Sequence, residues 1–182
     1  HKSKLVVGAE MMPFMDLLQP LIGHLVLDFG GIVGTHGTQE NREVFISTDS
    51  KFRVGTAICW EAEFGEFMTG YARNGANLIF AITNDGWWGN SPGHKQLLSY
   101  SRLRSIELRR SIVRSANTGI SAIINEKGDI IKSIEYEKNG IINDKISISN
   151  KLTFYAKYGD YISRISLFFF IIIFLFYFAK KK

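Results

Sequence analysis

The sequence predicts an α/β or α+β domain over residues 1–160, followed by one membrane-spanning helix over residues 161–179. Within residues 1–150, short β-rich runs alternate with segments of helical period, which is typical of mixed domains. Residues 161–179 are almost wholly apolar, with Arg164 as their only charged side chain. A helix needs about 17 to 25 such residues to cross a bilayer. The chain therefore combines a globular part with a membrane segment.

The predicted strands are short apolar runs bounded by turn residues. They cover residues 44–47, 52–58, 77–82, 112–115, 120–124, 130–134 and 141–148. Helical spacing predicts one helix over residues 64–73, stopped by Asn74-Gly75, and a second helix over residues 94–110. Residues 125–129 read Asn-Glu-Lys-Gly-Asp and predict a hairpin turn between two strands.

The segment over residues 11–34 fits neither pattern. Pro13, Pro20 and several glycines interrupt an apolar, methionine-rich run, and both residue types break regular elements. We expect a mobile hydrophobic arm here.

The ends of the predicted membrane helix carry the residues expected at a bilayer surface. Tyr161 and Tyr177 occupy interfacial positions, and Arg164 is close enough to the helix end for its side chain to reach water. Lys180–Lys182 favour a cytoplasmic basic tail, although three cations between residues 151 and 164 equal it in number on the other side. A buried core helix is the alternative interpretation of this segment.

Composition excludes several classes of function. The formal net charge is +5, of which Lys180–Lys182 supply three charges. The remaining +2 is too small for a nucleic-acid-binding surface, so no nucleic-acid partner is expected. A single cysteine cannot form an intramolecular disulfide, which excludes a disulfide-stapled scaffold. The histidines, at positions 1, 24, 36 and 94, lack the i, i+4 spacing of a zinc-binding helix, so no metal site is expected.

Cys59 stands at the end of the predicted strand over residues 52–58, just before a predicted helix. Such an elbow exposes a thiol beside backbone N–H groups, which stabilise a thiolate and can hold an oxyanion. We therefore interpret Cys59 as a nucleophile, with the backbone N–H of Trp60 as an oxyanion donor. A buried structural cysteine is the alternative, because free cysteine is among the most buried residue types.

A rival nucleophile is Ser91, since residues 89–93 match the G-x-S-x-G elbow of serine hydrolases. In that motif the residue after the serine donates its backbone N–H to the oxyanion, and Pro92 has no N–H. A Cys-His dyad is also possible, but the spacing selects none of the four histidines. Cys59 is therefore the preferred nucleophile.

Four ordered motifs resemble those of the nitrilase superfamily. They are Lys2-Ser-Lys-Leu-Val-Val-Gly-Ala-Glu10, Ile58-Cys-Trp-Glu61, Thr83-Asn-Asp-Gly-Trp-Trp-Gly89 and Arg114-Ser-Ala-Asn-Thr-Gly-Ile-Ser121. Among the branches of the superfamily, the chain most resembles the bacterial apolipoprotein N-acyltransferases, including Tyr155-Ala-Lys-Tyr-Gly-Asp160 directly before the membrane helix. The resemblance covers essentially the whole chain and implies a nitrilase-like αββα sandwich.

The resemblance also implies a reaction. Cys59, by its motif position, would attack a phospholipid ester and form a thioester, and the acyl group would pass to the N-terminal amine of a diacylglyceryl lipoprotein. Lys2 corresponds to the cation that helps to stabilise the oxyanion, and Glu10 to a second glutamate that orients the site. Glu61 matches a further acidic position, with a structural role as an alternative. The implied partners are a phospholipid donor, the lipoprotein acceptor and membrane lipid, and no cofactor is implied.

Asn84, Trp87 and Trp88 are candidates for the walls of a pocket, with turn and core roles as the alternative. For Lys2 and Glu10 the alternative is that both are solvated surface charges, as isolated lysines and glutamates usually are.

Two features depart from the pattern of the family. Its first glutamate, the general base, is expected upstream of Lys2 together with further membrane helices. The domain over residues 1–160 is therefore expected to be partial and inactive alone. Residues 5–10 read Leu-Val-Val-Gly-Ala-Glu where the family commonly has a proline and a Phe-Gly pair, which leaves the register of Glu10 open.

Two other functions compete with acyl transfer. A nitrilase-type amidase would use the same cysteine but transfer the acyl group to water, and a membrane-anchored remnant would keep the fold without catalysis. The predicted membrane helix and the apolar arm favour the acyltransferase, because a soluble amide substrate needs neither. The expected location is the bacterial inner membrane, with the catalytic domain on the periplasmic side.

Overall fold

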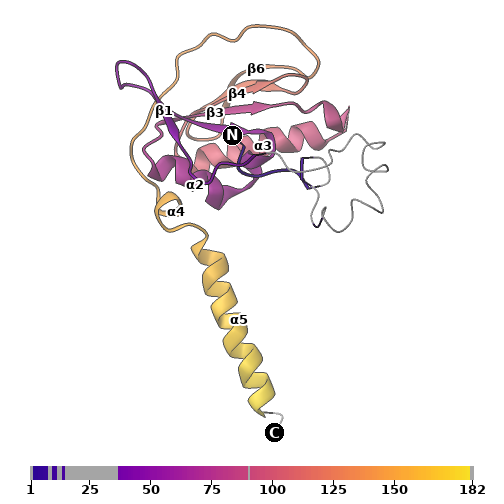
Figure 1. Ribbon diagram of the computed structural model, residues 1–182, viewed down its shortest axis with the longest axis vertical. Coiled ribbons are helices and arrows are strands. Elements are labelled where there is room, and N and C mark those ends of the chain that lie inside the picture. The colour runs from indigo at the N-terminus through magenta and orange to yellow at the C-terminus, as the bar shows by residue number, and fades with distance from the viewer. Residues whose placement is uncertain (1, 8–9, 12–13, 15–36, 90, 181–182) are drawn as a thin grey trace.

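The structure is a computed structural model that describes residues 2–7, 10–11, 14, 37–89 and 91–180. An α/β domain makes up most of it, and one long helix extends away from this domain to the C-terminus (Figure 1). The hydrophobic arm expected over residues 11–34 lies outside the described residues, apart from Met11 and Phe14.

Six strands form one mixed sheet in chain order, from β1 at one edge to β6 at the other. Their bounds are Val44–Ile46 (β1), Arg53–Ile58 (β2), Leu78–Thr83 (β3), Ile112–Ala116 (β4), Ser121–Ile124 (β5) and Ile130–Ile134 (β6). The neighbours β2, β3 and β4 are parallel, whereas β1, β5 and β6 pair antiparallel. The first six predicted strands are thus confirmed to within about one residue at each end, inside the usual uncertainty of element boundaries.

The helices α2 (Gly65–Arg73) and α3 (Gly93–Leu108) cover one face of the sheet (Figure 1). Along β3, Ile79 and Ala81 are buried in the core beneath these helices. Phe80 and Ile82 point to the opposite face and are 38% and 50% exposed, because successive side chains of a strand alternate between faces. In an αββα sandwich two sheets pack face to face. The sheet face that carries Phe80 and Ile82 is therefore the one that a second sheet would cover.

Local sequence sets the ends of the helix and hairpin that the sequence predicted. α2 ends at Arg73, and Gly75 follows with a φ of +91°, which glycine adopts readily. Residues 125–129 join β5 to β6, and the side-chain oxygen of Asn125 accepts two backbone hydrogen bonds within the turn, each of 2.9 Å. The stop signal and the hairpin turn are both confirmed.

The seventh predicted strand, over residues 141–148, is wrong. This segment is irregular, and Ile141 is 96% exposed. Its isoleucines are spaced almost as in a strand, but a strand needs a ladder of backbone pairs. Single hydrogen bonds attach this part of the chain to the domain instead. The Ser111 hydroxyl donates to the Ser147 carbonyl, and the Ser149 N–H donates to the Asn77 carbonyl.

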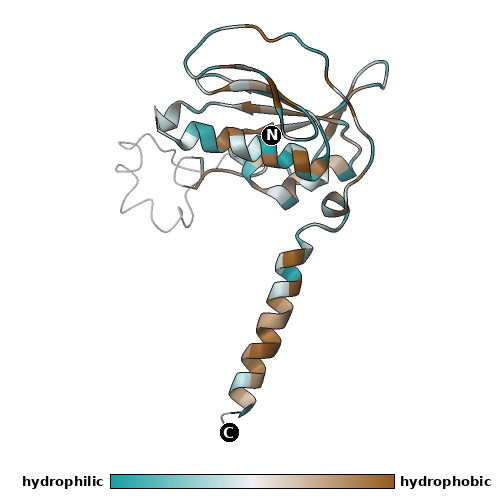
Figure 2. Cartoon of the chain, turned by 180° about the vertical axis from the view of Figure 1, so that it is seen from behind, coloured by the Kyte–Doolittle hydropathy of each residue, from teal (hydrophilic) through white to brown (hydrophobic). Residues whose placement is uncertain are grey.

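The C-terminal helix α5 (Tyr161–Lys180) follows the short helix α4 (Phe154–Tyr158). It points away from the domain and is apolar along most of its length (Figures 1 and 2). None of its described residues is buried by the rest of the chain, which contradicts the alternative of a core helix. By length and composition α5 can cross a membrane.

Candidate active site

Cys59 lies where β2 ends and the short 3-10 helix η1 (Cys59–Glu63) begins. Its φ of +54° is in the left-handed region, which costs a non-glycine residue about 1–3 kcal/mol and is concentrated at functional sites. The residue is half-buried. The structure therefore places the only cysteine of the chain at the strand-to-helix elbow that the sequence predicted.

Lys2 and Glu10 form an ion pair within the N-terminal segment. Lys2 Nζ lies 2.5 Å from Glu10 Oε2, and the same oxygen accepts a hydrogen bond of 2.8 Å from the backbone N–H of Val6. The Lys2 side chain is only 9% exposed. Charges shielded from water interact more strongly than exposed ones, so this pair holds the cation firmly in place.

Glu61 links the N-terminal segment to the Cys59 elbow. Its fully buried carboxylate accepts hydrogen bonds from the backbone N–H groups of Ser3 at 2.5 Å and Lys4 at 3.2 Å. The second oxygen accepts from the N–H of Ile58, directly before the cysteine, at 2.7 Å. Both oxygens therefore serve to position backbone, and Glu61 acts on the site through the segments that it joins.

A cavity of about 260 Å³ opens beside Cys59. It is lined by Val6, Glu10, Cys59, Trp60, Asn84, Trp87, Trp88 and Leu97. Because β2 and β3 are parallel neighbours, the residues that follow them meet at the same edge of the sheet, which is where ligands bind in many α/β folds. Most of the lining is apolar, so the cavity suits an apolar ligand beside a nucleophile.

The structure places seven of the eight proposed site residues either in the wall of the Cys59 cavity or at the elbow next to it. Cys59, Glu10, Trp60, Asn84, Trp87 and Trp88 line the cavity, and Glu61 supports it from behind the elbow. Lys2 is the eighth, and it is not among the lining residues. Lys2 contacts the cavity wall through its ion pair with Glu10.

Asn84, Trp87 and Trp88 lie in the turn after β3 and also line the Cys59 cavity. Asn84 lines the cavity and also accepts a hydrogen bond of 3.2 Å from the backbone N–H of Gly86, so the turn role and the pocket role coexist. The ring of Trp88 packs on Gly93, where an added Cβ would lie 2.4 Å from it. Glycine is therefore needed at the start of α3, and Trp88 holds that end of the helix against the cavity.

A buried ion pair below this turn was not identified from the sequence. Arg114 Nη2, on β4, lies 2.5 Å from Asp85 Oδ2, and both side chains are almost completely buried. Asp85 also accepts from the hydroxyl of Thr83 at 2.8 Å, and Arg114 donates to Ser101 on α3 at 3.2 Å. The pair fastens the Trp87-Trp88 turn to the sheet and to α3. Both residues occur in the motifs quoted above, which was the available signal.

His94 is the one histidine among the described residues, and it does not line the Cys59 cavity. Its ring stacks on Tyr136 with the centroids 4.3 Å apart. A Cys59–His94 dyad is therefore not formed in the described structure.

Residues 1–150 match the family model described as carbon-nitrogen hydrolase. The apolipoprotein N-acyltransferase of Bradyrhizobium diazoefficiens is 37% identical over 161 residues, and that of Geobacter metallireducens is 32% identical over 159 residues. A solved carbon-nitrogen hydrolase from Helicobacter pylori G27 superposes with a TM-score of 0.52 at 12% identity, covering 59% of this chain and 44% of that one.

The chain belongs to the carbon-nitrogen hydrolase family, which is the nitrilase superfamily that its motifs resemble. The likeness to the Helicobacter protein confirms the nitrilase-like α/β fold. The two acyltransferase alignments each cover 87% of this chain but only 29% of the relative. The chain thus spans less than a third of the length of these curated relatives.

Proposed function

We propose that the complete protein transfers a fatty acyl group from a phospholipid to the N-terminal amine of a bacterial lipoprotein, with Cys59 as the carrier. One observation supports this most directly. Cys59 stands on a strained elbow and opens onto an apolar cavity, whose wall includes the Glu10 partner of Lys2. The similarity to curated apolipoprotein N-acyltransferases agrees with this chemistry.

In the first half-reaction, the Cys59 thiolate attacks the carbonyl carbon of the phospholipid ester. The C–S bond forms, the ester C–O bond breaks, and the lysophospholipid leaves with a proton from the base, which regains one from the amine in the second half-reaction. The oxyanion of the tetrahedral intermediate is stabilised by the backbone N–H of Trp60 and by the positive charge of Lys2. The product is a thioester, which is a suitable carrier because it is readily attacked by an amine.

In the second half-reaction, the neutral amine of the lipoprotein attacks the thioester carbonyl. The C–N bond forms, the C–S bond breaks, and a base takes the proton that the amine loses. The thiolate of Cys59 is thereby regenerated. Trp60, Trp87 and Trp88 form the apolar wall along which the acyl chain lies.

The membrane location follows from the donor. A phospholipid ester is available only at a bilayer, and α5 can hold the domain there. We place the domain on the periplasmic side of the bacterial inner membrane, with the basic tail at residues 180–182 in the cytoplasm.

Mass spectrometry of the complete protein incubated with phospholipid tests the covalent step. We expect an acyl adduct on Cys59 that hydroxylamine removes, and N-acylated product when a diacylated lipopeptide is added. Lys2→Ala is expected to lower the rate at least about a hundredfold, the effect of losing one oxyanion donor. An adduct that resists hydroxylamine, or that persists in Cys59→Ala, would contradict the thioester. Free fatty acid as the main product would indicate hydrolysis.

We further propose that the 182-residue chain alone does not turn over substrate. Two acidic residues near the nucleophile are already engaged, Glu10 with Lys2 and Glu61 with backbone N–H groups. Neither is placed to accept a proton from the attacking amine. Repeated turnover by the purified chain, measured beside the complete protein, would overturn this assignment.

A further inference from the structure

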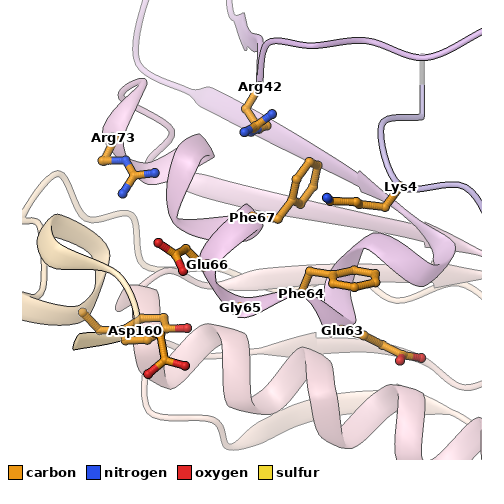
Figure 3. A pocket seen from close by; sticks show the side chains of 10 residues that line it. Lys4, Arg42, Glu63, Phe64, Gly65, Glu66, Phe67, Arg73 and Asp160 are labelled. Carbon is orange, nitrogen blue, oxygen red and sulfur yellow. The ribbon is translucent and has the colours of Figure 1, made fainter. Parts of the chain in front are cut away.

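A second cavity lies where the domain meets α5, and we call it the junction cavity. Its volume is about 620 Å³, and the charged residues that line it are Lys4, Arg42, Arg73, Glu63, Glu66 and Asp160. It shares no lining residue with the Cys59 cavity. Figure 3 shows Arg42 and Arg73 on one side of the junction cavity, and Glu66 and Asp160 on the other.

The cationic side of the junction cavity has no acidic partner among the described residues. None of the ion pairs in the described ranges involves Lys4, Arg42 or Arg73. The Arg42 guanidinium lies 4.8 Å from the centroid of the Phe67 ring, and Lys4 Nζ lies 5.8 Å from the same centroid. One aromatic ring thus brings two cations to the same wall. An arginine carries five N–H donors in a geometry that fits phosphate oxygens.

The acidic side of the junction cavity is tied to the first turn of α5. Hydrogen bonds from the hydroxyl and backbone N–H of Ser163 hold the pKa of Asp160 below its usual range. Glu66 forms an ion pair with Arg164. The junction cavity therefore presents separated positive and negative sides rather than a purely cationic one.

The junction cavity also lies at the depth of lipid head groups if α5 crosses the bilayer. Asp160 directly precedes α5. Three exposed aromatic residues cluster beside it, with the Phe154 ring 4.6 Å from Tyr158 and 4.9 Å from Tyr161 between centroids. Aromatic residues of this kind are enriched where bilayers meet water.

We propose that the junction cavity binds the head group of an intact zwitterionic phospholipid, with the phosphate on Lys4, Arg42 and Arg73 and the ammonium on Glu66 and Asp160. Such a head group carries both charges a few atoms apart and so matches both sides. A free phosphate would match only the cationic side and would face the carboxylates of Glu63, Glu66 and Asp160. The bound lipid is not the acyl donor, because it lies away from Cys59, and it would orient the domain on the membrane. This inference rests on α5 lying in a bilayer and does not depend on acyl transfer.

Native mass spectrometry of the complete protein tests the site. The protein is released from micelles that contain a diether phosphoethanolamine lipid, which has no carboxylic ester and cannot acylate Cys59. We expect Arg42→Gln/Arg73→Gln to bind this lipid at least about tenfold more weakly, since each cation contributes charge-assisted hydrogen bonds. The matched control is Arg53→Gln/Arg109→Gln, which removes two exposed charges that do not line the junction cavity. The control and Cys59→Ala should bind as wild type.

Several results would overturn the proposal. Undiminished binding in Arg42→Gln/Arg73→Gln, or an equal loss in the control pair, would exclude this cavity. Loss in Cys59→Ala would move the lipid to the other cavity. Full displacement by inorganic phosphate, or equal binding of a diether lipid with a glycerol head group, would refute the zwitterionic match.

If the double variant does not fold, Lys4→Gln, at an exposed position, is expected to weaken binding at least about threefold, and an unchanged affinity would count against the site. A missing thioester on Cys59 would leave all of these results unaffected.

Discussion

Replacing Glu61 with glutamine tests how the N-terminal segment is held against the Cys59 elbow. The substitution keeps the shape of the side chain but turns one accepting oxygen into a donating NH2 group. If the amide oxygen stays on Ser3 and Lys4, the NH2 group faces the N–H of Ile58 and two donors meet. If the amide flips, the bonds to Ser3 and Lys4 are lost instead. Either orientation leaves a backbone donor unpaired.

The magnitude follows from these hydrogen bonds. A bond to a charged group contributes about 1.5–3 kcal/mol, and a buried donor left without a partner costs about 1–3 kcal/mol. Because Glu61 is fully buried, we expect Glu61→Gln to lower the free energy of unfolding by roughly 3 kcal/mol. For a domain of this size that corresponds to a fall in Tm of about 10 °C. Acyl transfer should fall at least about tenfold, because the Lys2–Glu10 pair is no longer fixed beside the elbow.

Thermal unfolding of the complete protein, followed by circular dichroism, measures the effect. Glu63→Gln is the matched control, two residues further along the chain. Burial raises the pKa of Glu63, so its charged form is already disfavoured and its neutralisation should change stability by less than about 1 kcal/mol. A Tm for Glu61→Gln within about 2 °C of wild type, or an equal fall in Glu63→Gln, would refute the positioning role.

Three further outcomes are expected. Asp85→Asn should lower the free energy of unfolding in denaturant by about 3–5 kcal/mol, because it leaves Arg114 buried without its charged partner. The control Asp129→Asn, at an exposed position, should change it little, and equal effects of the two variants would contradict a buried pair. Burial raises the pKa of Glu107, so the folded state binds the proton more tightly than the unfolded state. The stability that this proton contributes is present below the usual carboxyl range and is lost as pH rises through the raised pKa, and Glu107→Gln should remove that part of the pH dependence. Deleting residues 161–182 from the 182-residue chain should release it from sedimented membranes, and a shortened chain that still sediments would argue against α5 as its anchor.

Most of the sheet and both domain helices could be predicted because their signals are local. Short apolar runs bounded by turn residues located six strands, and Asn74-Gly75 located the end of α2. The Cys59 elbow was also predictable, since a strand followed by a helix is visible within about ten residues of sequence. The segment over residues 141–148 shows the limit of that reasoning, because its composition suits a strand but no partner strand is available among the described residues.

The sequence by itself determined the α/β class, the apolar helix α5, the nucleophile candidate and the motifs that identify the family. Tertiary structure decided which distant residues meet. Asp85 and Arg114 are 29 positions apart and pair only because β3 and β4 are adjacent and parallel. Glu61 reaches Ser3 across 58 positions, and the junction cavity combines residues from Lys4 to Asp160. Side-chain patterns report which face of an element is buried, but long-range partners depend on how the elements pack, and no local pattern encodes that choice.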